Sequence, residues 1–303
     1  MLTRIISGAV GVVLLGVVLF FHDTLVLPLA VAAIVAVMLF ELLRAVKLHK
    51  CIPILIAAEA CGIAVPLLYG YFHKAKTVEY YLRDFRIYDE DNVMEIGYSH
   101  YVFCAVLLAS FVIFVTWLKK HKEIRYEQVF FVLAVMMLVP QAMTTMIRIE
   151  RLSNPETIDG YITVRGGLFL LVMGLCGAWI ADTGAYFTGV AIGKHKLCPE
   201  ISPKKTIEGL VGGIVTTAVV YSVAFSAYYG FTAKRVIIAF ITGAVCAVIG
   251  TVGDLSASMV KRQIGFKDYG KIMPGHGGLM DRFDSVLFVL PTFYAFIALF
   301  GVQ

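Results

Sequence analysis

The chain has 303 residues, of which 59% are hydrophobic and 16% are charged. A typical soluble domain has about 25% charged residues, so this composition excludes an ordinary soluble enzyme, a disordered chain and a coiled coil. The net charge of +5 is small, and the placement of the charges is more informative than their sum.

Nine apolar runs follow one another along the chain, and a helix needs about 20 such residues to cross a bilayer. They cover residues 5–22, 24–43, 52–72, 100–118, 127–147, 166–187, 209–229, 236–255 and 283–301. Backbone polar groups in lipid must be paired within the protein, and these runs lack the two-residue alternation of a barrel strand. The sequence therefore predicts an all-α polytopic membrane protein with about nine transmembrane helices.

We expect one integral membrane domain over residues 1–303. Residues 1–165 would hold spans one to five, and residues 166–303 would hold the catalytic spans six to nine with their motif loops. The first run precedes no small-x-small cleavage site before His22, so we predict a retained helix there. The six cysteines form no Cys-x-x-Cys pair, which argues against a disulfide framework or a zinc site.

Lysine and arginine in the connections indicate the orientation, because cytoplasmic loops are enriched in them. With the N-terminus in the cytoplasm, 17 of the 26 basic residues fall in inside connections and 9 fall outside. The sequence therefore predicts a cytoplasmic N-terminus and an outer C-terminus. The outer loop at 73–99 is net acidic.

Polar residues suited to chemistry gather between residues 179 and 284. Asp182 lies in or near span six, where a carboxylate is costly unless it faces water, a cation or a partner. It is either the wall of a polar cavity or a hydrated residue at the end of the span. The following inside connection offers hydroxyl groups and adjacent lysines that could bind an oligophosphate, although basic cytoplasmic loops are also expected from topology alone. Its candidates are Ser202, Lys204, Lys205 and Thr206, with Pro203 predicted to fix a turn.

A third stretch, 253–284, carries the strongest signal. In a helix, Asp254, Ser258 and Lys261 would share one face, as would Asp281 and Asp284 in a second helix. Converging carboxylates favour a cation such as Mg²⁺, which takes oxygen ligands and substrate phosphates. Basic residues that would hold phosphate oxygens are Lys261, Arg262, Lys267 and Arg282. His276, between glycines, is either a general base or phosphate donor or a residue that orders the turn.

At these residues the chain resembles the phosphatidate cytidylyltransferase family, also called CDP-diacylglycerol synthases. The family signature Ser-x-x-Lys-Arg, Lys-Asp and His-Gly-Gly-x-x-Asp-Arg-x-Asp is filled without departure. It is filled by Ser258, Lys261, Arg262, Lys267, Asp268, His276, Gly277, Gly278, Asp281, Arg282 and Asp284. The stretches at 182–186 and 202–209 also look like the family's. The resemblance covers about 179–285 by motif.

The resemblance implies Mg²⁺-dependent transfer of a cytidylyl group from CTP to phosphatidic acid, giving CDP-diacylglycerol and pyrophosphate for phospholipid biosynthesis. It assigns Asp254, Asp281 and Asp284 to the metal, with a monovalent cation such as K⁺ allowed beside Mg²⁺. Phosphates would be held by Lys204, Lys205, Lys261 and Arg262, with Ser202 and Ser258 donating hydrogen bonds. Membrane lipid and a second copy of the chain are implied as partners, and nucleic acid is not.

Two other functions are weighed against this one. CDP-alcohol phosphotransferases carry Asp-Gly-x-x-Ala-Arg, and no Ala-Arg follows Asp159-Gly160 at that spacing. A secondary transporter would use Asp182 and Asp254 as intramembrane ion sites, but it should show related halves, and no repeat is visible. The compact chain without an evident organelle-targeting segment favours a bacterial plasma membrane, with the active site on the cytoplasmic side.

Overall fold

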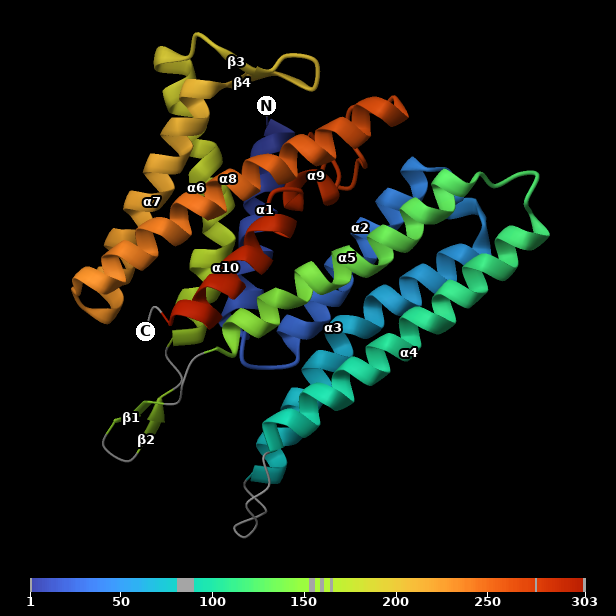
Figure 1. Ribbon diagram of the computed structural model, residues 1–303, viewed down its shortest axis with the longest axis horizontal. Coiled ribbons are helices and arrows are strands. Elements are labelled where there is room, and N and C mark those ends of the chain that lie inside the picture. The colour runs from blue at the N-terminus through green and yellow to red at the C-terminus, as the bar shows by residue number, and fades with distance from the viewer. Residues whose placement is uncertain are drawn as a thin grey trace. The chain divides into compact units, whose positions relative to one another are not determined.

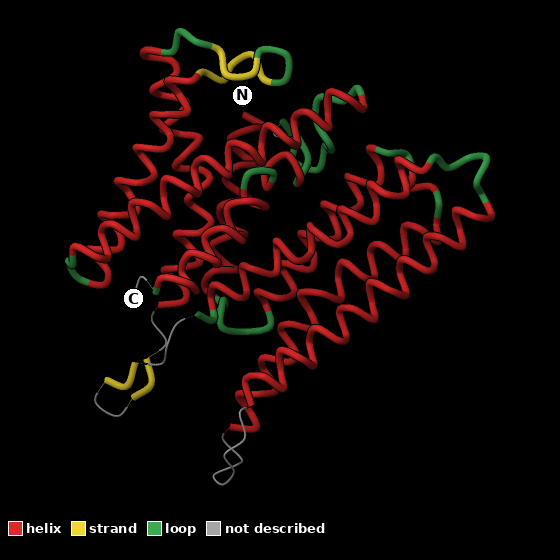
Figure 2. The backbone as a smooth tube through the Cα atoms, viewed as in Figure 1, coloured by secondary structure: helices red, strands yellow, loops and turns green. Residues whose placement is uncertain are grey.

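The computed structural model describes the backbone of residues 2–80, 90–152, 156–158, 161–163, 166–275 and 277–301, and side chains within 6–72, 98–152, 166–275 and 277–301. Helices make up most of it, and the strands form two small antiparallel hairpins (Figures 1 and 2). The elements in chain order are α1 (Leu2–Phe20), α2 (Val26–Ala45), the 3₁₀ turn η1 (Leu48–Lys50), α3 (Ile52–Tyr80), α4 (Glu90–Lys119), α5 (Tyr126–Glu150), β1 (Glu156–Ile158), β2 (Tyr161–Thr163), α6 (Gly166–Ile192), β3 (Lys196–Cys198), β4 (Ser202–Thr206), α7 (Ile207–Tyr229), α8 (Ala233–Ile264), α9 (Met280–Phe283) and α10 (Val286–Phe300).

Eight of the nine predicted spans are confirmed, and the first forms a shorter helix. Among the described residues, eight helical segments are long and apolar enough to cross a membrane, and Ile6–Phe20 forms a shorter apolar helix. Each of these segments corresponds to one predicted run. Most ends of the segments lie within a few residues of the ends of the predicted runs. All six cysteines are free, as their spacing predicts.

The described chain divides into two compact units. The first comprises Met1–Ile147 with Tyr269–Met280, and the second comprises Arg148–Asp268 with Asp281–Gln303. The predicted organisation, one membrane domain divided at residue 165, stays a prediction.

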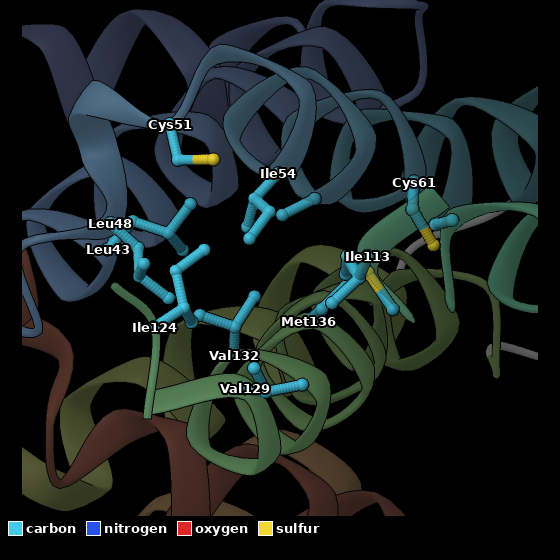
Figure 3. Packing of buried hydrophobic residues seen from close by; sticks show 12 residues of the cluster. Leu43, Leu48, Cys51, Ile54, Cys61, Ile113, Ile124, Val129, Val132 and Met136 are labelled. Carbon is cyan, nitrogen blue, oxygen red and sulfur yellow. The ribbon is translucent and has the colours of Figure 1, made fainter. Parts of the chain in front are cut away.

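The first unit packs around an apolar core contributed by α2, η1, α3, α4 and α5. Figure 3 shows side chains of this core, with those of α3 facing those of α4 and α5. Ile54, Ile113, Val129, Val132 and Met136 are fully buried in it. Lipid is as apolar as these side chains, so close van der Waals packing holds such helices together.

The second unit is built on α6, α7 and α8, with α10 packed on α8 and α6. Its helices approach closely because glycines face backbone atoms of the neighbouring helix. A Cβ on Gly213 would lie 2.7 Å from the carbonyl oxygen of Ala181, and one on Gly209 would lie 2.8 Å from that of Ala185. The glycines that open α7 thus allow close packing against α6. In Figure 1, α6 and α7 run side by side, and the β3–β4 hairpin joins their ends.

We predict that Gly243→Ala destabilises this unit by about 2 kcal/mol, a typical cost of overpacking. A Cβ at Gly243 would lie 2.7 Å from the Thr217 carbonyl oxygen and 2.9 Å from the Ala218 Cα, and neither backbone atom can move aside cheaply. Gly16→Ala is the matched control, because nothing lies within 4 Å of its added Cβ. The midpoint of thermal unfolding in detergent should fall for the first variant alone. Equal midpoints would contradict close α7–α8 packing.

Three local predictions are corrected. Helical backbone enters the predicted 73–99 loop from both sides, since α3 reaches Tyr80 and α4 begins at Glu90. Pro203 lies inside strand β4 and not in a turn, and the turn falls at 199–201. The helix expected to carry both Asp281 and Asp284 is interrupted at 284–285. There the Asp284 side chain accepts the Ser285 backbone N–H at 2.8 Å, and such local bonds compete with helix formation.

Candidate active site

The carboxylate of Asp254 lies within the uninterrupted helix α8, near its C-terminal third. Its Oδ2 is 2.5 Å from the Nζ of Lys205, which strand β4 supplies. The Ser258 hydroxyl, one turn further along α8, donates to Asp254 Oδ1 at 3.4 Å. Two motifs that are about 50 residues apart in the sequence therefore meet at one carboxylate.

Two further carboxylates face this one within the second unit. Electrostatic interactions join Asp182 of α6 to Lys205 and Asp254, and join Asp284 to Asp254, Lys261 and Asp182. Asp284 is buried, whereas the Asp182 side chain is exposed. Three carboxylates thus interact electrostatically with one another and with two lysines, and like charges at short range raise the free energy unless a cation compensates them.

Lys261 forms the second ion pair of the site. Its Nζ is 2.8 Å from Asp281 Oδ1, and the two side chains are only 11% and 5% exposed. Lys261 also faces Asp284 electrostatically. Asp281 is therefore placed by Lys261, while Asp254 is placed by Lys205. Asp254, Ser258 and Lys261 share one face of α8, as predicted, because the helix is continuous through all three residues.

The remaining predicted residues lie around these pairs. Thr206 is buried, and its hydroxyl accepts the Gly209 N–H at 3.1 Å as the N-cap of α7, a stabilising role for a helix start. Its predicted phosphate contact stays a prediction, as does that of Ser202, which is half-buried at the start of β4. Four cationic side chains are exposed to solvent: Lys204, Arg262, Lys267 and Arg282. His276 lies outside the described residues.

The turn before α9 contains two glycines in the left-handed region. Gly275 and Gly277 have φ of 79° and 88°, a region that only glycine enters at little cost. The Met273 N–H bonds back to the Gly277 carbonyl at 3.0 Å.

Sequence reasoning missed Glu208 as a structural contact. Its carboxylate accepts the backbone N–H groups of Lys194 and His195 at 3.1 and 3.2 Å, and its Oε1 is 2.6 Å from the His195 ring Nδ1. Glu208 thereby anchors the connection that leads into the β3–β4 hairpin, which carries Lys205. The only sequence signal was an acidic residue in the first turn of a helix.

No group of three or more histidine, cysteine, aspartate or glutamate side chains in the described part of the chain is placed to hold a metal ion. Two of the carboxylates, Asp254 and Asp281, each form an ion pair with a lysine. This arrangement leaves oxygen donors available for a cation that takes most of its ligands from elsewhere.

Comparison with known proteins identifies the family of the chain. A model of the cytidylyltransferase family matches residues 2–300. Proteins named phosphatidate cytidylyltransferase are similar to the chain: one from Bacillus subtilis (strain 168) is 48% identical over 123 residues, which are 41% of this chain and 45% of that protein. One from Staphylococcus haemolyticus (strain JCSC1435) is 43% identical over 131 residues, 43% of this chain and 50% of that protein. The chain thus spans about half the length of the curated relatives it matches. Since the family model covers nearly all of the chain, the chain belongs to the cytidylyltransferase family.

Proposed function

We propose that this chain transfers a cytidylyl group from CTP to phosphatidic acid and releases pyrophosphate, forming CDP-diacylglycerol for phospholipid biosynthesis. The observation that carries the proposal is the ion pair between Lys205 and Asp254. It brings together the two sequence stretches, 202–206 and 253–284, that are predicted to bind phosphates. The names of the similar proteins support the same reaction.

The reaction joins a phosphate oxygen of phosphatidic acid to the α-phosphorus of CTP and breaks the bond to the pyrophosphate leaving group. That oxygen is already ionised at neutral pH, so positioning and charge compensation are the main requirements. The exposed Lys204 and Arg262 would bind phosphate oxygens, as would Lys267 and Arg282. Lys205 and Lys261, already among carboxylates, would hold the reacting phosphates near Asp254 and Asp284, with Ser202 and Ser258 donating hydrogen bonds. His276 would act as a general base or phosphate donor, or only order the turn.

The donor set suits Mg²⁺, although it lacks a three-residue cluster. Mg²⁺ commonly takes one or two carboxylates and completes its shell with water and substrate phosphates. Asp254 and Asp284 repel each other electrostatically, which a shared cation would relieve, and Asp281 is the third proposed ligand. When bound, Mg²⁺ would supply charge neutralisation on the phosphate oxygens. A monovalent cation such as K⁺ is proposed beside it.

Label transfer tests the proposal. Purified chain in detergent, given phosphatidic acid, labelled CTP and Mg²⁺, should incorporate label into lipid, and chelation of Mg²⁺ should stop incorporation. Asp284→Asn should lower the rate at least about hundredfold, while Glu123→Gln, a 71% exposed carboxylate on a connection, should not. A folded wild-type chain that labels no lipid would contradict the proposed reaction. Full incorporation under chelation would contradict the magnesium requirement alone.

We also propose a bacterial plasma membrane location with the N-terminus and the active site on the cytoplasmic side. The connections that this orientation places in the cytoplasm hold most of the lysine and arginine residues, which supports it. CTP is also a cytoplasmic nucleotide. Impermeant thiol reagents on intact cells should label a cysteine placed at Phe231, in the α7–α8 connection, and not one placed at Glu200, in the β3–β4 turn. The reverse pattern would contradict the orientation.

We propose a homodimer as the assembly, on the family resemblance. The molar mass of the active protein in detergent, measured by light scattering, should equal two chains. An active preparation with the mass of one chain would contradict it.

A further inference from the structure

Glu41 is an ionisable residue buried inside a membrane-spanning helix. It lies near the C-terminal end of α2, and its side chain is only 1% exposed. A buried carboxylate is costly unless its oxygens accept hydrogen bonds. Its position therefore needs a reason in the structure.

Its oxygens bind the backbone of a distant segment in the same unit. Oε2 accepts the Met280 N–H at 2.8 Å, and Oε1 accepts the Leu279 N–H at 3.1 Å. These amides end the loop that connects α8 to α9, at the point where α9 starts. The first N–H groups of a helix have no acceptor within it, and here a side chain from 238 residues away provides one.

Two glycines of the same loop are packed directly against this carboxylate. A Cβ on Gly270 or on Gly278 would lie 2.6 Å from Glu41 Cδ, and closer still to its oxygens. The two positions after His276 therefore require glycine for different physical reasons. Gly277 supplies a positive φ, whereas Gly278 leaves room for Glu41.

We propose that Glu41 is a positioning residue for the reaction: it fixes the end of the 269–280 loop and so the start of α9, whose next residue is Asp281. Asp281 is the partner of Lys261, so its placement depends on where α9 begins. The inference rests on the proposed cytidylyl transfer for its effect on rate, but its effect on the loop is independent of that reaction. The contacts that carry this inference are the two that Glu41 makes with the backbone N–H groups of Leu279 and Met280.

Glu41→Gln tests this with little change in volume. The amide can accept only through its oxygen, and its NH₂ group would face the second backbone N–H. Hydrogen exchange of peptides within 277–283 should accelerate about tenfold or more, and kcat of label transfer should fall by a similar factor. The KM values for both substrates, the melting temperature and exchange elsewhere should stay near the wild type. A purely structural role would instead lower stability and raise exchange throughout.

Glu59→Gln is the matched control. Glu59 is a carboxylate on α3 in the same unit, and within the described part of the chain neither of its oxygens has a hydrogen-bond partner. Its neutralisation should leave exchange at 277–283 within about twofold of wild type. If Glu41→Gln fails to fold, Gly278→Ala approaches the same contact from the loop, and it should accelerate exchange there and lower kcat.

The outcomes separate the two proposals. Unchanged exchange and unchanged kcat in Glu41→Gln, or in Gly278→Ala where the first does not fold, would overturn the positioning role. Accelerated local exchange with unchanged kcat would overturn its effect on the reaction. A wild-type chain that transfers no label, with local exchange still accelerated in the variant, would refute the proposed function while the anchoring of the loop stands.

Discussion

Asp254→Asn is expected to lower cytidylyl transfer by about a hundredfold to a thousandfold, the usual cost of removing one charge-stabilising group from an active site. The carboxylate pairs with Lys205, accepts the Ser258 hydroxyl and faces two other carboxylates. No other residue described in the second unit combines these contacts. The measurement is the initial rate of label entering lipid at saturating CTP and phosphatidic acid.

The Mg²⁺ dependence distinguishes two roles for Asp254. If it holds the metal, the Mg²⁺ concentration for half-maximal rate should rise severalfold in Asp254→Asn, as expected when a ligand is lost. If it only orients Lys205, that concentration should stay constant. Lys205→Met combined with Asp254→Asn should be little slower than the slower single variant, because residues acting as a unit are non-additive. Glu123→Gln again serves as control, and a wild-type rate in Asp254→Asn would contradict the site.

Lys261→Met is expected to destabilise the second unit by about 3–5 kcal/mol, the typical cost of breaking a buried pair by removing one partner. The Lys261 side chain is buried, forms an ion pair with Asp281 and interacts electrostatically with Asp284. Asp281→Asn should cost less, because Lys261 keeps Asp284 as a compensating charge. The stability of both variants is measured in detergent as the midpoint of thermal unfolding and as resistance to proteolysis.

The double variant Lys261→Met with Asp281→Leu checks the cause. Replacing both members of a buried pair with apolar residues is often close to neutral, so the double variant should be more stable than Lys261→Met alone, although inactive. If the double variant instead lost the sum of the effects of Lys261→Met and of Asp281→Leu measured alone, the ion pair itself would not control stability here.

The spans could be predicted because 20-residue apolar runs leave no other structure in lipid. The face of α8 that carries Asp254 and Ser258 could also be predicted, because helical spacing fixes it once the helix continues through residue 264. The break between α9 and α10 could not, since it depends on a local bond from Asp284 to the Ser285 amide. The turn predicted at Pro203 was wrong, because proline is common in turns but is also tolerated in a strand that has a free edge.

The contacts that define the site depend on tertiary structure. The sequence predicts that Lys204 and Lys205 lie on the same side of the membrane as Asp254. It does not indicate which of the two adjacent lysines contacts Asp254. Strand β4 separates them, because alternate residues point to opposite faces, and Lys205 is the one that reaches Asp254. Glu41 was overlooked because its partners are backbone amides, which leave no trace in residue identity. Its only signal was a carboxylate inside an apolar run.

The length of α8 has a consequence for how sequences of this kind can vary. Its 32 residues form one unbroken helix, in which each residue advances by 1.5 Å and turns by about 100°. Inserting or deleting a single residue between Gly243 and Asp254 would turn every later side chain away from its partner while the glycine contact stayed in place. The turn at 199–201 carries no such constraint, so insertions should be tolerated there and excluded from the α8 segment.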